Sequence, residues 1–236
     1  YLIMFGRKKI VILTGAGMSA ESGISTFRDS NGLWENHNIY DVASPEGFER
    51  NPLLVNNFYN QRRKQLLECQ PNLGHLSLVE LEQKYDVNII TQNVDDLHER
   101  AGSKNITHLH GELRKVRSIQ NPDLILDWDK DITPNDKGSD GHSLRPHIVW
   151  FGEDLPLFEE AVSITKKADI LIVIGTSLQV YPAAGLIHYV DFDVPKYLID
   201  PQADTMNSIL SFNIIPFKAT IGVPILVKEL LDETDK

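Results

Sequence analysis

Cysteine is almost absent from this chain of 236 residues, and Cys69 is the only one. A single cysteine excludes an internal disulfide and every zinc site that is built from several cysteines. The same scarcity is typical of proteins in a reducing compartment, so we expect a cytoplasmic protein.

Long hydrophobic runs are also lacking, because no apolar stretch approaches the roughly 20 residues that a membrane span needs. The opening residues Tyr1–Met4 are not preceded by a cationic segment of the kind found in signal peptides. The formal net charge of −10 argues against direct nucleic-acid binding and favours lysine-rich partners within the range of salt screening. We therefore expect a soluble protein without membrane or nucleic-acid partners, and we expect a monomer.

Short β-branched runs alternate with helical patterns along much of the chain, and 42% of its residues are hydrophobic. The runs span Ile10–Thr14, Val87–Thr91 and Ile170–Gly175, and the helical patterns span Pro52–Glu68, Leu73–Lys84 and Phe158–Lys167. Strands that are apolar throughout and separated by helices predict a parallel sheet covered on both faces. The expected fold class is therefore α/β, with a Rossmann-like sheet.

Two polar segments rich in turn-forming residues, 29–51 and 114–145, interrupt this alternation. We expect them to form a small inserted lobe over the edge of the sheet. The predicted NAD-binding domain then comprises 1–28, 69–113 and 148–236. The predicted small lobe comprises 29–68 and 114–147.

A glycine-rich loop follows the first predicted strand, with Gly15, Ala16, Gly17 and Ser19 in the pattern of a dinucleotide-binding turn. Small residues let the backbone approach a pyrophosphate, whose charge then lies at a helix amino terminus. A tight strand-to-helix turn without a ligand is an equally open interpretation. The acidic residue expected about 20 positions later in dehydrogenases is missing, which argues against hydride transfer.

Six sequence blocks occur in an order that resembles the sirtuin (Sir2) family. The blocks are Gly15–Arg28, Pro71–His75, Thr91–His98, His108–Gly111, Leu144–Glu153 and Gly175–Ala183. The resemblance runs from Ile10 to about Leu231 and is weakest across 114–145. Ser25 stands where the family usually has proline, which should loosen the first loop.

This resemblance implies an NAD-dependent protein-lysine deacylase. Its products would be nicotinamide, the free lysine and 2′-O-acyl-ADP-ribose. The alternative activities are those of a protein ADP-ribosyltransferase or an NAD hydrolase, because water or another side chain can capture the same sugar.

The resemblance also implies roles for residues that follow the predicted strands. Asn93 would orient the nicotinamide ribose and a water molecule, Asp95 would hold the nicotinamide carboxamide, and Gln92 would contact the ribose. The residues alone favour a helix cap for Asn93 or Asp95. His110 would be the general base, since an imidazole titrates near neutrality. The remaining histidines of these blocks, His75, His98 and His108, are expected to be structural.

Further contacts are implied for the rest of the cofactor and for the peptide. Phe27 would screen the reacting centre from water, and Arg28 would bind phosphate, although a surface ion pair is an open alternative. The adenosine half would lie near Gly175, Thr176, Ser177 and Asp200. Val149, Phe151 and Gly152 would form an edge to which a peptide adds as a strand, the alternative being a strand end with an apolar plug.

Tyr59 and Arg62 lie three residues apart in a helical stripe that is otherwise apolar or aromatic. The stripe consists of Val55, Phe58, Tyr59, Arg62 and Leu66. This Tyr-x-x-Arg pair resembles the one that desuccinylase and demalonylase sirtuins use to bind an acidic acyl group, and the arginine fork matches a carboxylate. The alternative is an arginine that extends over the helix edge to solvent.

Most sirtuins carry four zinc-binding cysteines in the small lobe, and 114–145 contains none. His142 and His147 match no metal site by their spacing. We expect no metal, and a lobe held by packing alone through Ile119, Leu124, Leu126 and Trp128.

Overall fold

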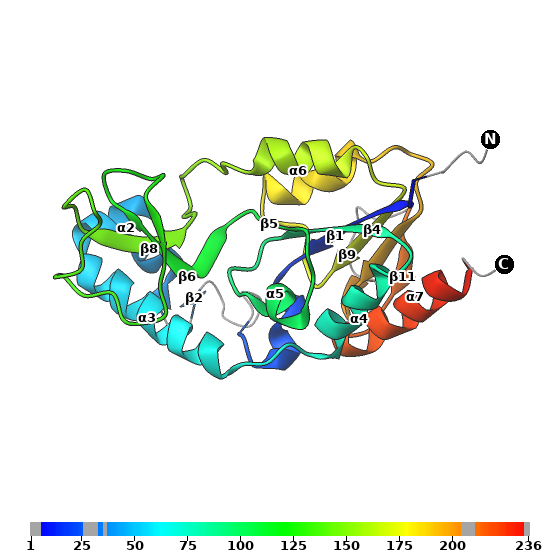
Figure 1. Ribbon diagram of the computed structural model, residues 1–236, viewed down its shortest axis with the longest axis horizontal. Helices are drawn as coiled ribbons and strands as arrows, with labels where there is room; N and C mark the ends of the chain where they lie inside the picture. Colours follow the sequence, from blue (N-terminus) through cyan, green and yellow to red (C-terminus); the bar gives the residue numbers. More distant parts are fainter. Residues whose placement is uncertain (1–5, 26–32, 35–36, 204–210, 234–236) are drawn as a thin grey trace.

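The computed structural model describes residues 6–25, 33–34, 37–203 and 211–233. The molecule is elongated, with a six-stranded sheet toward one end and a three-stranded sheet at the other (Figure 1). We call the six-stranded sheet with its covering helices the large lobe. The three-stranded sheet with helices α1 (Ile39–Val42), α2 (Pro45–Arg50) and α3 (Pro52–Glu68) is the small lobe. The exact domain boundaries given above stay a prediction.

The sheet of the large lobe is parallel throughout, in the order β11-β10-β9-β1-β4-β5. Its strands are β1 (Lys9–Thr14), β4 (Asp86–Thr91), β5 (Ile106–His108), β9 (Ile170–Ile174), β10 (Lys196–Ile199) and β11 (Asn213–Ile215). The central strand β1 is buried from Ile10 to Thr14, because helices cover the sheet on both sides. The predicted Rossmann-like parallel sheet is confirmed.

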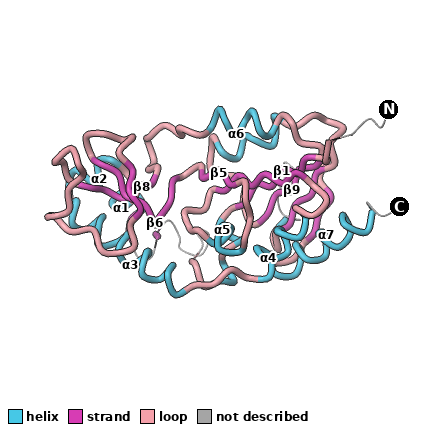
Figure 2. The backbone as a smooth tube through the Cα atoms, in the orientation of Figure 1, coloured by secondary structure: helices cyan, strands magenta, loops and turns pink. Residues whose placement is uncertain are grey.

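Helices lie on both faces of this sheet (Figure 2), and one apolar layer packs against each face. One layer contains α4 (Leu73–Leu81) and α7 (Ala219–Glu233), and the other contains α6 (Phe158–Thr165) and the 3-10 helix Ala183–Tyr189. Both α4 and α6 are shorter than predicted. Each ends in tight i to i−3 turns, such as Lys84 N–H to the Leu81 carbonyl, which bring the chain back toward the next strand.

The remaining elements form the small lobe, except α5, which connects β4 to β5 in the large lobe and packs against α4. They are β2 (Leu33–Trp34), β3 (His37–Asn38), α1 (Ile39–Val42), α2 (Pro45–Arg50), α3 (Pro52–Glu68), α5 (Leu97–Ala101), β6 (Gly111–Ser118), β7 (Ile125–Asp127) and β8 (Leu144–Ile148). Strand β6 lies between β7 and β8 in an antiparallel sheet.

Helix α3 has the predicted bounds, and its ends have local causes. Asn51 accepts a hydrogen bond from the Leu54 amide at 3.1 Å, and Pro52 occupies the first turn, where its missing N–H costs nothing. The helix ends where Cys69 becomes extended, two residues before Pro71. Its buried face includes Tyr59 and also Arg63, which is only 1% exposed and which the sequence did not single out.

The small lobe is not held by packing alone, so that prediction is wrong. Its core consists of Val116, Ile132 and Leu144, with Leu126 and Trp128 partly buried against them. Ile119 is 49% exposed and does not contribute, and Leu124 lies outside this core.

Polar side chains of α3 anchor the same lobe. Asn60 exchanges two hydrogen bonds with the backbone of Ile132, at 2.8 and 3.0 Å. Arg63 donates to the carbonyl oxygens of Leu113 and Lys130. Because buried backbone groups need partners, these bonds fix the segment after β6 to α3.

Chelation is expected to leave the small lobe folded. A structural zinc ion contributes on the order of 10 kcal/mol to folding. If the protein held such an ion, a strong chelator would lower its melting temperature greatly. We expect a change of less than about 1 °C in thermal denaturation with EDTA, together with substoichiometric zinc by elemental analysis. One zinc ion per chain in the purified protein would contradict this expectation.

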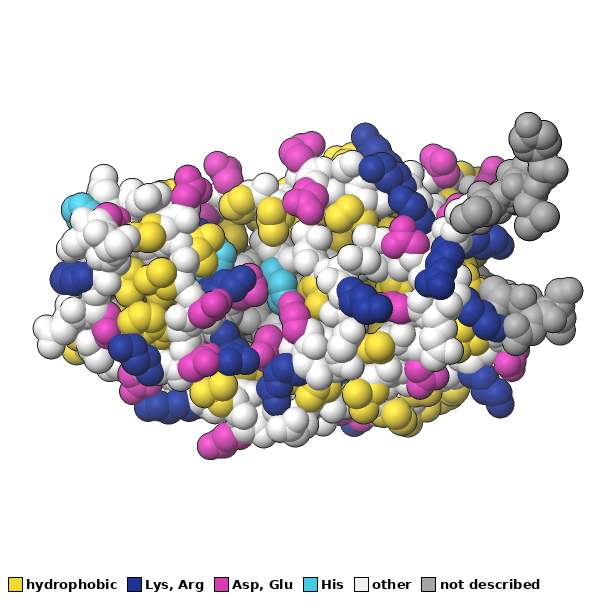
Figure 3. All heavy atoms as spheres, in the orientation of Figure 1, with side chains coloured by type: hydrophobic (Ala, Val, Ile, Leu, Met, Phe, Trp, Pro, Cys, Tyr) yellow, Lys and Arg dark blue, Asp and Glu magenta, His cyan; other side chains and the backbone are white. Residues whose placement is uncertain are grey.

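None of the helices in the described part of the chain combines the length and the apolar composition that crossing a bilayer requires. Acidic and basic side chains are interspersed over the described part of the face shown in Figure 3. The absence of nucleic-acid binding stays a prediction.

Candidate active site

The carboxyl ends of the parallel strands meet along one edge of the large lobe, and the small lobe faces that edge. Five segments that follow β1, β4, β5, β9 and β10 line one cavity of about 680 Å³, within the usual range for ligand pockets. These segments contribute Ala16, Gly17, Ser19, Gln92, Asn93, Asp95, His110, Gly175, Thr176, Ser177 and Asp200. The small lobe contributes Tyr59 and Arg62 from α3, and the turn after β8 adds Val149–Glu153. Gly15 lies behind this wall.

The glycine-rich loop after β1 forms two short 3-10 turns, Ala16–Met18 and Ala20–Ser22, instead of opening a long helix. The expected helix amino terminus is therefore missing, and exposed loop amides would have to take its place. A Cβ on Gly17 would lie 2.7 Å from the Gly175 Cα, so these glycines let the loops after β1 and β9 touch. That contact includes the Gly17 amide donating to the Gly175 carbonyl at 2.8 Å.

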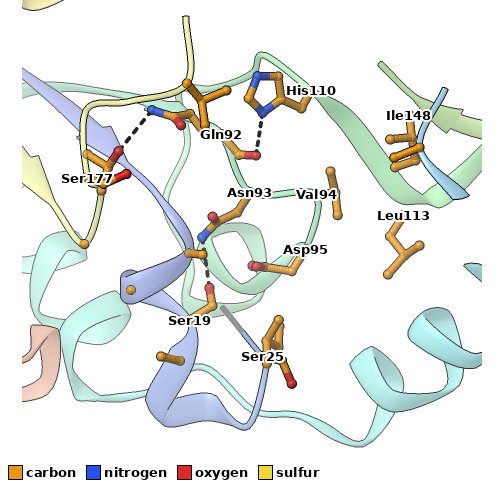
Figure 4. A pocket seen from close by; sticks show the side chains of 18 of the residues that line it. Ser19, Ser25, Gln92, Asn93, Val94, Asp95, His110, Leu113, Ile148 and Ser177 are labelled. Carbon is orange, nitrogen blue, oxygen red and sulfur yellow. Dashed lines mark hydrogen bonds between the residues drawn. The ribbon is translucent and has the colours of Figure 1, made fainter. Parts of the chain in front are cut away.

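Asn93 is 7% exposed, and its amide group is fixed by the loop after β1 (Figure 4). Its Nδ2 donates to the Gly15 carbonyl and to Ser19 Oγ, each at 3.1 Å. Since both donor hydrogens are directed into the loop, Oδ1 is the atom suited to accept a hydrogen bond from a ligand. The side chain contacts neither end of α5, so the helix-cap interpretation does not hold for Asn93.

Asp95 lies below Asn93 in the same wall and is 5% exposed. Burial raises the pKa of its carboxyl group to about 6, although hydrogen bonds from Ser19 and from the Leu97 amide act in the opposite direction. The bond to Leu97 is a local turn contact of the kind expected for a cap. The carboxyl group therefore has both a structural partner and a position in the cavity wall.

His110 is held by the backbone of the neighbouring strand end. Its Nδ1 lies 3.0 Å from the Gln92 carbonyl oxygen (Figure 4). A carbonyl only accepts, so Nδ1 carries the hydrogen and Nε2 keeps the lone pair that a base needs. Burial lowers the pKa of His110, with the Gln92 carbonyl opposing the shift, and the imidazole is therefore neutral at physiological pH.

The other histidines of the six sequence blocks, His75, His98 and His108, are buried and do not line the cavity. His75 completes a capping box with Asn72 at the start of α4. His98 lies 3.1 Å from Thr14 Oγ1, and burial lowers its pKa well below the usual value. His108 lies 2.6 Å from Glu99; burial would lower its pKa, but this carboxylate raises it overall.

The segment Val149–Glu153 is not the extended edge that was expected. Strand β8 ends at Ile148, and a turn follows in which the Glu153 amide donates to the Trp150 carbonyl at 3.0 Å. Gly152 adopts a φ of 91°, which favours glycine. Trp150 is 2% exposed, as the alternative of an apolar plug implied, whereas Phe151 and Gly152 are exposed at the cavity.

Tyr59 and Arg62 lie on the wall that the small lobe contributes. Tyr59 is 1% exposed, and its hydroxyl accepts a hydrogen bond from Trp150 Nε1 at 3.0 Å. The Arg62 guanidinium stacks over the Phe58 ring at 4.6 Å, and its Nε and Nη1 atoms are shielded from solvent. The interpretation in which Arg62 extends away to solvent is therefore wrong.

Some site residues escaped the sequence analysis, and two predicted ones are not described. Val94, Leu113 and Ile148 form an apolar part of the wall between His110 and α3 (Figure 4). Val94 and Ile148 lie within the matched sequence blocks without an assigned role, and Leu113 lies outside them; the three side chains meet only when the two lobes fold together. Phe27 and Arg28 lie outside the described residues.

Comparisons with known proteins agree with this architecture. A sequence model of the Sir2 family matches residues 15–182. An NAD-dependent protein deacylase of Bacteroides thetaiotaomicron is 55% identical over 230 residues, covering 95% of this chain and 98% of its own. One from Helicobacter pylori is 60% identical over 196 residues, covering 83% of this chain and 84% of its own.

Solved structures give the same result. A Sir2 homologue–NAD complex superposes with a TM-score of 0.85 at 38% identity, covering 96% of this chain and 91% of its own. A Sir2 homologue variant in complex with 2′-O-acetyl ADP ribose has a TM-score of 0.85 at 37% identity, covering 98% and 94%. A Sir2 protein bound to an acetylated peptide has a TM-score of 0.71 at 28% identity, covering 97% and 94%.

Proposed function

Because the chain belongs to the Sir2 family, it is an NAD-dependent protein deacylase, and we propose that the cavity between its lobes is where deacylation takes place. The observation that carries this proposal is the meeting of Asn93, Asp95 and His110 on one wall of a single cavity, with Tyr59 and Arg62 on another. The chemistry of the wall with Asn93, Asp95 and His110 suits the cofactor. The chemistry of the wall with Tyr59 and Arg62, which we call the acyl wall, suits the acyl group.

The residues of the large lobe suit an NAD molecule by their chemistry. Gln92, Thr176 and Asp200 offer an amide, a hydroxyl and a carboxylate at neighbouring strand ends, and such groups bind ribose hydroxyls and amides. Bound NAD would supply the glycosidic bond to nicotinamide, whose cleavage leaves a sugar carbon able to react with the acyl-lysine oxygen. We propose that Gly17 and Ser19 contact the phosphates and that Gly175–Ser177 and Asp200 hold the adenosine half.

The residues after β4 would act at the nicotinamide end. Asn93 Oδ1 would accept from a ribose hydroxyl or a water molecule, because its nitrogen is already committed to Gly15 and Ser19. Asp95 would hold the carboxamide. Its raised pKa means that this role requires a pH above about 6 if the carboxylate form is the one that binds.

His110 would serve as the general base. With Nδ1 fixed on the Gln92 carbonyl, Nε2 would accept the proton of a ribose hydroxyl as that oxygen attacks the captured acyl group. Water then releases the free lysine and 2′-O-acyl-ADP-ribose. The Sir2 homologue solved with 2′-O-acetyl ADP ribose supports this product by similarity.

The acylated peptide would enter between the turn after β8 and the loop after β9. Phe151 and Gly152 of the first segment and Val180–Pro182 of the second all line the cavity. Val149 N–H already donates to the His110 carbonyl, and Phe151 N–H donates to the Ala43 carbonyl, so the peptide would bond to other backbone groups of these segments. The Sir2 protein solved with an acetylated peptide supports peptide binding by similarity.

We further propose that the enzyme removes succinyl and malonyl groups as well as acetyl groups. Arg62 brings a permanent positive charge to a wall otherwise formed by Tyr59, Leu113 and Ile148. A guanidinium binds a carboxylate through paired hydrogen bonds, and a mostly apolar surrounding strengthens this attraction.

The proposed activity is tested by the fate of NAD. Incubation with NAD and acetyl-, succinyl- or malonyl-lysine peptides is expected to yield nicotinamide, deacylated peptide and acyl-ADP-ribose in equal amounts by mass spectrometry. ADP-ribose attached to protein would indicate a transferase, and free ADP-ribose without loss of the acyl group would indicate an NAD hydrolase. Either of these as the main product would overturn the proposal.

A further inference from the structure

A buried ion-pair network lies behind the acyl wall and converges on Glu153. Arg145 donates to its carboxylate at 2.6 and 3.1 Å, and Arg117 donates at 3.1 and 3.2 Å. The Trp150 amide adds a bond at 2.8 Å. Arg145 is only 8% exposed. Buried ion pairs often contribute little net stability, so their value more often lies in fixing a geometry.

The geometry that this network fixes is that of the Trp150 ring. The Arg145 guanidinium carbon lies 3.3 Å from the ring centroid, and the Phe48 ring lies at 5.2 Å. The hydrogen bond from the Trp150 amide to the Glu153 carboxylate holds the backbone of the same residue. The indole is therefore held through its face and through its backbone, and it has little freedom to turn.

The indole in turn fixes Tyr59. An indole nitrogen only donates, so the phenol oxygen accepts the bond at 3.0 Å and cannot return its own hydrogen to Trp150. That hydrogen must point elsewhere, and the phenol becomes a better donor when its oxygen accepts. Arg62 lies three residues later on the same side of α3, and both residues line the cavity.

We infer that Trp150, held by the Arg145–Glu153 ion pair, is a positioning residue that orients the Tyr59 hydroxyl as a donor to the carboxylate of an acidic acyl group. This inference rests on the proposed recognition of succinyl and malonyl groups by Tyr59 and Arg62. It adds that the selectivity for an acidic acyl group depends on a side chain that does not itself bind the acyl carboxylate.

The test compares Trp150→Phe with Trp128→Phe, a change of the same kind in the distal part of the small lobe. Trp150→Phe keeps an aromatic ring for Arg145 but removes the N–H. We expect the ratio of kcat/KM for succinyl-lysine over acetyl-lysine peptide to fall about three- to tenfold, mainly through the KM of the succinyl peptide. The KM for NAD should change less, and Trp128→Phe should leave the ratio unchanged.

Arg145→Met is a second variant, to be used only if thermal denaturation shows that it folds. It is expected to lower the same ratio, because the indole loses its support. Trp150→Phe alone keeps the inference testable if this variant does not fold.

Two further variants separate this inference from the function on which it rests. If wild-type enzyme shows no activity on succinyl peptide, or if Arg62→Met and Tyr59→Phe leave the ratio intact, the proposed acyl recognition is wrong. If those variants lower the ratio but Trp150→Phe leaves it unchanged, the positioning role of Trp150 is wrong. An equal loss of kcat on both peptides would also contradict it.

Discussion

Replacing His110 with alanine is expected to lower the kcat of deacylation about 100- to 10,000-fold, the usual contribution of a well-placed general base. The reason lies in the geometry: the Gln92 carbonyl holds Nδ1–H and leaves Nε2 as an acceptor in the cavity, at the end where we propose that nicotinamide binds. Alanine removes that acceptor and leaves the strand ends in place. The measurement is steady-state formation of deacylated peptide at saturating NAD and peptide.

The matched control is His188→Ala, since His188 is exposed and lies outside the residues that line the cavity. It should retain wild-type kcat. The affinity for NAD, measured by calorimetry, should change little in His110→Ala, because the glycine-rich loop after β1 and the loop after β9 are unchanged. A His110→Ala enzyme with kcat near that of the wild type would show that another group takes the proton.

The same residue sets the direction of the pH dependence. Burial lowers the pKa of His110 from its usual value of 6.5, and the base works only when neutral. The rate is therefore expected to stay constant near neutrality and to fall only at a pH below the usual pKa of an imidazole. Asp95, with a pKa raised to about 6, loses its negative charge over the same acidic range. Asp95→Asn should remove one of the two ionisations from the acidic limb of the profile.

Local patterns were sufficient to predict the elements that position the site. The β-branched runs predicted β1, β4 and β9 to within one residue at each end, because these strands are buried on both faces. The helical pattern that begins at Pro52 predicted the start of α3. Since carboxyl ends of parallel strands share one edge, the meeting of Asn93 and Thr176 also followed from the order of the predicted strands, whereas His110 was singled out only by the family resemblance.

Features that depend on contacts between distant segments could not be predicted. The turn at Gly152 depends on Glu153 bonding to Arg145 and Arg117, which come from two other strands of the small lobe. The burial of Arg63 depends on carbonyl oxygens 50 and 67 residues away in the chain. Period and composition report which face of an element is apolar, but they do not report which partner a charged side chain meets.

The acyl wall gives the second large expected effect. Arg62→Met is expected to lower kcat/KM for succinyl-lysine peptide about 30- to 1,000-fold, the range that follows from removing one partner of a shielded charge pair. The methionine keeps much of the volume and the packing over Phe58, so the wall keeps its shape. The loss should fall mainly on KM, because the guanidinium binds the acyl carboxylate in both the ground state and the transition state.

The acetyl-lysine peptide serves as the internal comparison, because it has no carboxylate for Arg62 to bind. Its kcat/KM should change far less than that of the succinyl peptide, which reverses the preference between the two. Arg50→Met is the matched control: Arg50 pairs with Asp41 on the surface of the small lobe and should affect neither substrate. If Arg62→Met lowers both activities equally, the arginine supports the fold of α3 and does not select the acyl group. If it changes neither, the acidic acyl group binds elsewhere in the cavity.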